Sequence, residues 1–219
     1  MPNRGDRGGA RTRARIAEVA TELFLERGFD DVTIAEVAAA AGVSKVTVFA
    51  HFERKEDLLL DRLPDVIDIV RTAIRDRADG LDPVEALRQA ALALAAQRHP
   101  LSGLSEGADV EPFVRTLMAS PALIARLRAF AHEIETELAA ALHADAGFSG
   151  DSTLTAALLV AAYRTVAAES LRRRLAGDDL ADIATAHQQR VNAAFDAVAH
   201  GVSASHRPAP RQPKPRRRR

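Results

Sequence analysis

The sequence predicts an all-α protein with a small N-terminal head and a larger helical body. Apolar residues recur at helical spacing along most of the 219 residues, and alanine and leucine dominate the composition. A hydrophobic content of 47% is enough for a buried core. Near the N-terminus, two short helical segments with their own start and stop signals follow each other closely. We therefore expect a three-helix head followed by a helical domain.

The first head helix is predicted over residues 11–27. Ile16, Val19, Ala20, Leu23 and Phe24 form one apolar stripe, and Gly28 is placed to end the helix. This stripe predicts a helix that braces the two that follow.

The stretch 33–52, TIAEVAAAAGVSKVTVFAHF, predicts two helices joined by a tight turn. Thr33 with Glu36 forms a capping-box pattern, and Gly42 stops the first helix. Ser44 then caps a second helix that buries Val48. Three side chains project outward from that second helix: Lys45, Thr47 and His51. One exposed helix on a braced partner is typical of a DNA-reading helix-turn-helix, although a plain helical hairpin in a core would share the pattern.

Four further helices are predicted in the body before its last pair. A long helix from Glu56 to about Ala78 should be kinked at Pro64, and Asp82-Pro83 starts a helix to about Arg98. Residues 99–109 should be irregular. Helices from about Val110 to Ala119 and from Pro121 to about Ala144 follow.

The last two helices, 154–175 and 180–200, are more apolar than the others. The final helix carries one stripe, made of Leu180, Ile183, Ala184, His187, Val191, Ala194, Phe195 and Val198. Such a pair forms half of an intermolecular four-helix bundle, or it closes the core of its own chain. The periodicity alone leaves both interpretations open.

Charge is distributed unevenly although the formal net charge is +0. Residues 1–15 and 203–219 are strongly basic, whereas the remainder is acidic, so favourable contact with DNA must be local. We expect a disordered basic arm at 1–10, the head at 11–55, the ligand-binding and dimerisation domain at 56–202, and a disordered basic tail at 203–219. Each tail either contacts phosphates or only adds solubility.

Several classes of protein find no support in the sequence. There is no cysteine for a disulfide or thiolate metal site, and the histidines share no metal-ligand spacing. Motifs of zinc proteases, di-iron bundles, hydrolases, P-loops and dinucleotide sites are missing, so we predict neither an enzyme nor a cofactor. The absence of an apolar leader and of a long uncharged apolar run predicts a cytoplasmic protein without membrane contact.

The head resembles the N-terminal signature of the tetracycline-repressor (TetR) family of bacterial transcriptional regulators. The similarity covers roughly residues 11–60 and depends on the order Gly28-Phe29, Thr33, Ala41-Gly42-Val43-Ser44, Phe49-Ala50-His51-Phe52 and Lys55-Glu56-Asp57-Leu58. The resemblance implies a homodimer that places its second head helices in successive major grooves of a near-palindromic operator. A likeness of the last helices to the acyl-CoA-sensing branch is weaker.

The resemblance also implies roles for individual residues. Lys45, Val46 and Thr47 would face base edges, while Thr33, Ser44, His51 and Lys55 would hold phosphates, although Thr33 and Ser44 could serve only as helix caps. Phe49 departs from the family, which usually has a tyrosine whose hydroxyl meets phosphate. In the body, the resemblance implies an effector pocket. Its candidate lining is Phe113, Leu117, Met118, Phe130, Tyr163 and Arg164, which could equally be ordinary core residues or, for Arg164, an ion-pair partner of Glu133 or Glu137.

The function predicted in this way is that of a ligand-responsive regulator, most often a repressor. A small hydrophobic or amphipathic effector would release it from double-stranded DNA. The identity of this effector is unknown, and an acyl-CoA-like molecule is one candidate. The alternative is an architectural DNA-binding protein that uses its basic tails and responds to no effector.

Overall fold

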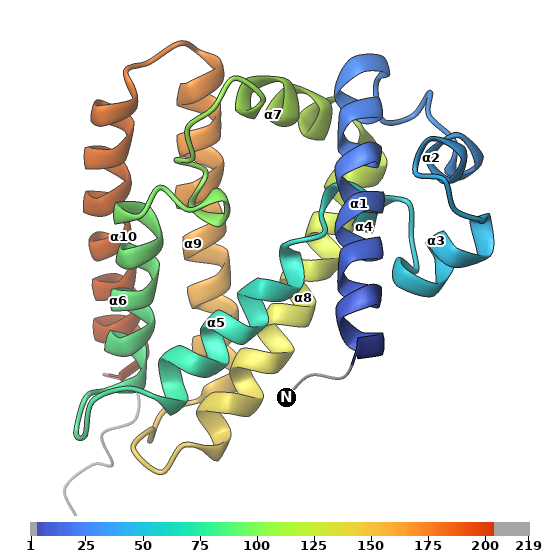
Figure 1. Cartoon of the computed structure of the whole chain (residues 1–219). Coiled ribbons are helices and arrows are strands. Elements are labelled where there is room, and N and C mark those ends of the chain that lie inside the picture. The colour runs from blue at the N-terminus through green and yellow to red at the C-terminus, as the bar shows by residue number, and fades with distance from the viewer. Residues whose placement is uncertain (1–3, 204–219) are drawn as a thin grey trace, which may run out of the picture.

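The regular structure of the described residues is entirely helical, which confirms the predicted fold class. A computed structural model describes residues 4–203 (Figure 1). Its helices, in chain order, are α1 (Arg4–Arg27), α2 (Ile34–Ala40), α3 (Lys45–His51), α4 (Glu56–Leu59), α5 (Leu63–Arg75), α6 (Pro83–Ala96), the 3-10 turn η1 (Pro100–Ser102), α7 (Val110–Ala119), α8 (Pro121–Ala144), α9 (Ser152–Leu175) and α10 (Leu180–Ser203).

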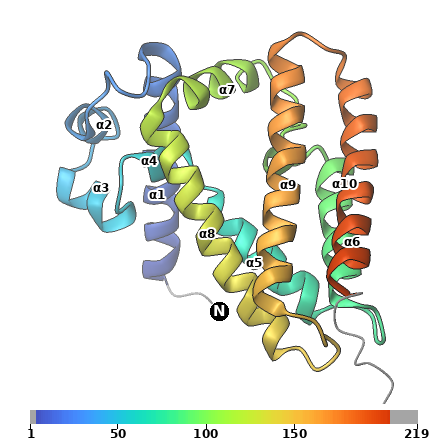
Figure 2. The ribbon, with the colours of Figure 1, turned by 180° about the vertical axis from the view of Figure 1, so that it is seen from behind.

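The head lies at one side of the molecule and the last two helices at the other. In Figures 1 and 2, α2 and α3 project outward from α1, whereas α9 and α10 run side by side at the opposite side with α6 against them. Between these two ends, α5 and α8 run diagonally. Helix α7 lies between α9 and α1 and leads into the start of α8 beside α1. The arrangement leaves α3 on the outer surface, far from α10.

The N-terminal arm differs from the prediction. Residues 4–10 form the first turns of α1 instead of a disordered arm. The physical reason is that no proline interrupts the chain between Arg4 and Arg11, so the bracing helix extends upstream. A Cβ atom built on Gly9 would lie 3.9 Å from His51 Cε1, so this extension passes close to the end of α3. Most of the predicted basic tail, from residue 204 onward, lies outside the described residues.

The predicted long helix after Lys55 is also different. It is divided into α4 and α5, and the break falls at residues 60–62. Pro64 lies in the first turn of α5, where its missing N–H leaves no hydrogen bond unmade, so it starts a helix instead of kinking one. The head and the body are therefore linked by two separate helices, α4 and α5, with a short break between them.

One hydrophobic core is shared by the head and the body. Ile16, Phe24, Val37 and Val48 are fully buried in it. Leu117 of α7 and Leu123 of α8 belong to the same cluster, although they lie far from the head in sequence. A second cluster joins α5, α6, α8, α9 and α10 inside the body. The predicted boundary between residues 55 and 56 thus does not separate two cores.

The apolar stripe of α10 packs inside its own chain. Ile183, Val191, Phe195 and Val198 are 0–7% exposed and contact the body. Of the two interpretations left open by the sequence, the structure shows the closed core, because this face of α10 covers α6 and α9. A dimer contact would have to use another face.

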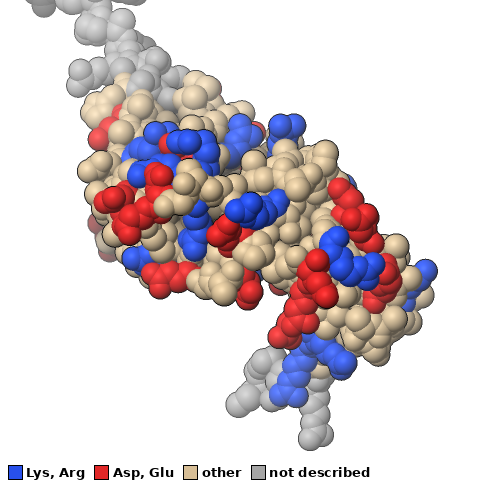
Figure 3. Space-filling view, turned by 90° about the horizontal axis from the view of Figure 1, so that it is seen from above, with Lys and Arg blue, Asp and Glu red and all other residues tan. Residues whose placement is uncertain are grey.

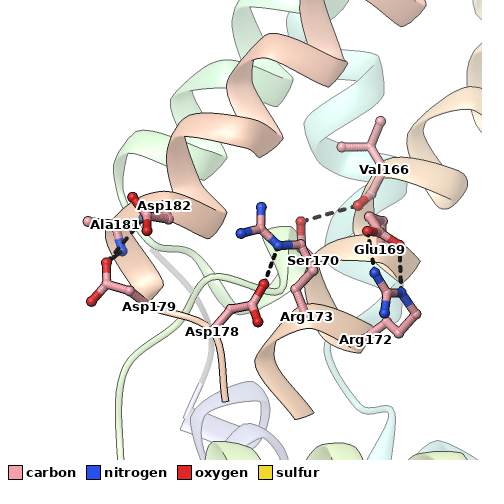
Figure 4. A network of polar contacts seen from close by, with 9 residues as sticks. All are labelled: Val166, Glu169, Ser170, Arg172, Arg173, Asp178, Asp179, Ala181 and Asp182. Carbon is pink, nitrogen blue, oxygen red and sulfur yellow. Dashed lines mark hydrogen bonds and ion pairs between the residues drawn. The ribbon is translucent and has the colours of Figure 1, made fainter. Parts of the chain in front are cut away.

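The turn between α9 and α10 is fixed by local polar contacts (Figure 4). Arg173 Nε donates to Asp178 Oδ2 at 2.6 Å, and the Asp179 carboxylate accepts from the backbone N–H groups of Ala181 and Asp182 at the start of α10. Gly177 adopts φ +83°, a left-handed conformation that ends α9. These contacts hold the two last helices antiparallel.

By length and composition, α9 is apolar enough to cross a membrane, and the bent pair α2–α3 would count as a second such segment. The buried core helix of a globular domain passes the same test. Leu159 and Val166 of α9 are buried among the other body helices, whereas 28% of its most apolar 18-residue stretch is buried in all.

Candidate nucleic-acid interface

The pair α2–α3 has the geometry of a helix-turn-helix. The two seven-residue helices bend by 100° at the intervening turn. This angle lies within the range of about 90–120° that is typical of the DNA-binding motif. The bend presents the outer side of α3 to solvent, while both α2 and α3 lie against α1 (Figure 1).

Both short helices begin at side-chain caps, as the sequence predicted. Thr33 Oγ1 accepts from the Glu36 backbone N–H at 3.3 Å, and the Glu36 carboxylate accepts from the Thr33 N–H at 2.8 Å. Ser44 Oγ accepts from the Thr47 N–H at 3.0 Å. Helices of two turns have little stability of their own, so these caps and the buried face together define where each one starts.

The turn between the helices depends on Gly42. Its φ of +66° is left-handed, and the Val43 N–H donates to Ala38 O while the Gly42 N–H donates to Ala39 O. These two bonds are the Schellman arrangement that satisfies the last carbonyls of a helix. A side chain at Gly42 would be strained by its φ, so the turn requires glycine.

Arg13 of α1 holds the far end of α3. Its guanidinium donates to the His51 carbonyl oxygen and lies 4.1 Å from the centroid of the Phe52 ring. A cation at the last carbonyls of a helix is favourable, and stacking on an aromatic face adds to it. Sequence alone does not single out Arg13, because it looks like the other arginines of the basic N-terminal segment.

The exposed surface of α3 is made of one cation and several apolar groups. Lys45 is exposed, and so are Val46, at 78%, and Phe49, at 53%. The Thr47 hydroxyl is half-buried and pairs with Ser44 Oγ at 2.9 Å. The structure therefore brings the predicted base-facing residues Lys45 and Val46 to the outer side, whereas Thr47 already has a partner for its hydroxyl.

The residues predicted to hold phosphates are placed differently from one another. Thr33 and Ser44 are exposed at the starts of α2 and α3, and His51 is half-buried at the end of α3. Lys55 Nζ donates to Phe29 O at 2.5 Å and lies 4.3 Å from the Phe29 ring centroid. The ammonium group of Lys55 is thus directed into the head, which explains its position in the motif without a phosphate.

The carboxyl group of Glu36 is strongly acidic. Hydrogen bonds from Thr33, followed by that from Arg27, lower the pKa of Glu36 to about 2. Arg27 Nη2 lies 2.7 Å from Glu36 Oε1. The capping box therefore keeps its negative end near the N-terminus of α2, where the helix dipole favours it.

Polar contacts connect the head to the body at two places. Arg126 of α8 donates to Asp57 of α4 at 2.7 Å and to Glu133 at 2.8 Å, and its side chain is only 14% exposed. Ser120, at the α7–α8 junction, donates to Asp30 in the loop after α1 at 3.2 Å. Together with Leu117 and Leu123, these contacts attach the head to α7 and to the first turns of α8.

The six residues predicted to line an effector pocket are not brought together. Leu117 packs in the head core, and Met118 and Arg164 are exposed. Phe113 packs against the head core, which leaves Phe130 and Tyr163 in the interior of the body. Two surface cavities, of about 290 and 160 Å³, are lined by other residues: Ala10, Arg13, Ala14, Asp61, Arg62 and Asp65 for the larger, and Arg75, Arg77, Ala78, Asp79 and Gly80 for the smaller. Helical spacing shows which residues are apolar but not which helix they face, so the sequence could not show which of the six lie close together.

A buried polar pair joins α9 to α10. His187 is 1% exposed, and its Nδ1 lies 2.9 Å from Ser170 Oγ, while no partner reaches Nε2 within the described residues. Burial lowers the pKa of His187, so the ring is neutral in the folded chain at pH 7. Tyr163 lies edge-on to this ring, and burial raises the pKa of its phenol to about 12.

Comparisons with known proteins agree on one family. Residues 16–61 match the model of the family described as bacterial regulatory proteins, tetR family. The transcriptional regulator TcmR of Streptomyces glaucescens is 28% identical over 158 residues, which are 71% of this chain and 70% of TcmR. TtgR of Pseudomonas putida is 36% identical over 81 residues, but this match covers only 36% of the chain and 38% of TtgR.

The likeness in fold extends over almost the whole chain. The structure of SmeT, the repressor of a multidrug efflux pump of Stenotrophomonas maltophilia, in complex with triclosan matches with a TM-score of 0.55. That match covers 94% of this chain and 100% of the other at 19% identity. On the face that Figure 3 shows, acidic and basic side chains are interleaved.

Proposed function

Because the chain belongs to the TetR family of bacterial transcriptional regulators, we propose that it is an effector-responsive repressor that binds a near-palindromic operator as a homodimer. The observation that carries this proposal is the exposed, capped helix α3, held at 100° to α2 and braced at both ends by α1 and Ser44. A short helix enters the major groove only when a partner fixes its direction, and this arrangement supplies that partner.

The proposed DNA contacts follow from exposure. Lys45 and Val46 face the base edges, together with the methyl group of Thr47. The exposed hydroxyl groups of Thr33 and Ser44, the imidazole of His51 and the N-terminal amides of α2 and α3 lie close to the phosphates. Lys55 is left out of the phosphate contacts because its ammonium group binds Phe29.

The proposed dimer contact uses the outer face of α9. Leu154 is 49% exposed and Leu158 38% exposed, and Thr165 and Ala168 continue the same face. With α10 alongside, this face supplies half of a four-helix bundle at the end of the molecule opposite to the head. The two α3 helices would then lie about 34–36 Å apart, one turn of DNA.

The proposed effector is a small, largely apolar molecule that enters the body near Phe130 and Tyr163. Phe130 is buried on α8, and the Tyr163 hydroxyl donates to Leu101 O at a long 3.5 Å. That weak bond leaves the phenol able to turn toward a ligand. SmeT, which shares the fold, binds triclosan. An acyl-CoA would place its acyl chain near Phe130 and Tyr163 of this chain.

Release from DNA would follow from a shift between two arrangements of the heads. An effector must prefer the arrangement with wrongly spaced α3 helices by about 5.5 kcal/mol to reverse a 99:1 equilibrium. The route between the sites runs through α8, because Arg126 and Leu123 of this helix contact the head directly.

Genomic footprinting of the purified full-length protein tests the proposed function. We expect protection of a few palindromic sites, relieved by an apolar compound such as triclosan or by a long-chain acyl-CoA. Lys45→Ala should weaken operator binding by about 1–3 kcal/mol, while the matched variant Arg128→Ala, an exposed cation on α8, should not. Uniform coating of DNA by the wild-type protein would favour an architectural role instead.

Sedimentation tests the dimer contact independently of DNA. Leu158→Asp should yield a folded monomer with weakened operator binding, since Leu158 lies on the exposed face. Ile183→Asp should instead unfold the body, because Ile183 is 1% exposed inside the chain. A dimeric Leu158→Asp variant would contradict the proposed face.

A further inference from the structure

Helix α3 exposes apolar side chains that the fold does not need. Val46 and Phe49 are two of the five large apolar side chains that are exposed among the described residues, at 78% and 53%. They are three residues apart, so they lie on one face of the helix, and the exposed Ala50 adjoins them. The packing of α3 against the head is made by Val48 and Phe52, which are 0% and 2% exposed. Exposed apolar groups therefore remain on the side that faces away from the head.

Val46, Phe49 and Ala50 together form an apolar ridge on α3. The polar groups next to this ridge have partners within the chain. Ser44 Oγ and Thr47 Oγ1 lie 2.9 Å apart, and Ser44 also accepts the Thr47 N–H. Lys45 is the exposed cation of α3 beside the ridge. Recognition by hydrogen bonds between α3 and base edges would thus depend mainly on Lys45, while the largest exposed area is apolar.

The major groove offers one apolar group on a base edge. This group is the C5 methyl of thymine, since guanine, adenine and cytosine present only donors and acceptors there. An apolar side chain that enters the groove displaces water from polar base edges without replacing their hydrogen bonds, unless it covers such a methyl group. Along α3, Val46 and Phe49 are separated by about 4.5 Å, close to the rise of about 3.4 Å between base pairs.

We propose that Val46 and Phe49 select thymine at two neighbouring positions of each operator half-site by covering its C5 methyl group. This inference rests on the proposed function, because it needs α3 in the major groove. It goes further in assigning base preference to two side chains without any hydrogen-bonding atom. Phe49, which lacks the hydroxyl of the usual family tyrosine, then reads a base instead of holding a phosphate.

Replacement of thymine by deoxyuridine tests the proposal on the wild-type protein. The operator is first selected from random DNA with the full-length chain, and each thymine of a half-site is then replaced by deoxyuridine, which removes only the methyl group. We expect affinity to fall about fourfold for each methyl covered, which corresponds to about 0.8 kcal/mol for one buried carbon group. Two neighbouring positions of each half-site should respond.

Variants assign each methyl to its side chain. Val46→Ala should abolish the response to deoxyuridine at one position and Phe49→Ala at the other, and both should keep the helical content of the wild type. Met118→Ala removes a side chain that is 56% exposed on α7, and it should keep both responses. The control shows whether loss of any exposed apolar group changes DNA binding.

The outcomes separate this proposal from the proposed function. If selection yields no preferred sequence, the proposed function itself fails. If an operator is found but no deoxyuridine position weakens binding, the operator assignment stands and the methyl contacts are wrong. Persistence of both responses in Phe49→Ala would show that Phe49 covers no methyl and would overturn its half of the proposal.

Discussion

The head and the body are both helical, but they are held by interactions of very different range. In the head, the caps of α2 and α3 join residues three apart, Thr33 with Glu36 and Ser44 with Thr47. In the body, Arg77 pairs with Asp145 across 68 residues of sequence, and Arg126 of the body reaches Asp57 at the head across 69. Caps formed between neighbouring residues define where α2 and α3 begin. Contacts between residues distant in sequence determine how the body packs against them.

The shared core predicts that the head is not stable without the body. Leu117→Ala should therefore have the largest effect, because Leu117 is a body residue that is 6% exposed inside the head core. We expect a loss of about 2–5 kcal/mol in the free energy of unfolding, with head and body melting in one transition. Met118→Ala, at the exposed neighbouring position, is the matched control for chemical denaturation. A separate early transition of the head in Leu117→Ala would show that the two regions fold independently.

The ion pair between α8 and α4 joins the two regions at a site that is largely shielded from water. Its two side chains are 14% and 21% exposed, whereas Arg115 and Glu111 form a pair that is 66% and 55% exposed. A double-mutant cycle on Arg126→Ala and Asp57→Ala should give a coupling of roughly 1–3 kcal/mol. The same cycle on Arg115 and Glu111 should give roughly 0–1 kcal/mol, as water screens exposed pairs. Equal coupling in both cycles would remove Arg126 as a special link to the head.

These differences explain what could be predicted from sequence. The head was predicted in detail because Thr33, Gly42 and Ser44 are local signals whose partners lie within five residues. The helices of the body were predicted for a similar reason, since a 3.6-residue period needs no knowledge of neighbours. The partner that each apolar face covers could not be predicted. Apolar residues such as Ile183 and Phe195 have the same spacing whether they lie in a dimer contact or in the core of their own chain. Arg13, Arg126 and the true direction of Lys55 depend on tertiary contacts that no spacing shows.

The buried pair Ser170–His187 makes the stability of the body sensitive to acid. Burial lowers the pKa of His187 from its ordinary value of 6.5, so the unfolded chain binds a proton that the folded chain does not. Stability is therefore fully present above pH 6.5 and falls below it, by at most about 1.4 kcal/mol for each pH unit. His187→Leu should flatten this slope in denaturation curves measured between pH 7 and 5, whereas Ser170→Ala, which keeps the titrating ring, should retain it. An unchanged slope in His187→Leu would assign the acid sensitivity to other groups.

Glu36 supplies the corresponding acid response of the head, and we expect it to be the smallest effect. Its pKa is lowered to about 2 by the Thr33 hydrogen bonds and by Arg27, against 4.5 for the free side chain. A carboxyl group with a lowered pKa stabilises the folded state above pH 4.5, and this contribution is lost as the pH falls from 4.5 toward 2. Because the group is exposed, solvent screens part of the interaction, and the caps hold only the two turns of α2. Glu36→Gln should remove the acid response. Thr33→Ala should narrow the pH range of that response, because it removes the side-chain hydrogen bond that lowers the pKa of Glu36 most and leaves the bond from the Thr33 backbone. Amide hydrogen exchange in residues 34–40 at pH 3 and 5 measures this directly. If exchange in α2 does not accelerate toward pH 3 in the wild type, the capping box is not what holds the first helix of the motif, and packing on α1 alone must do so.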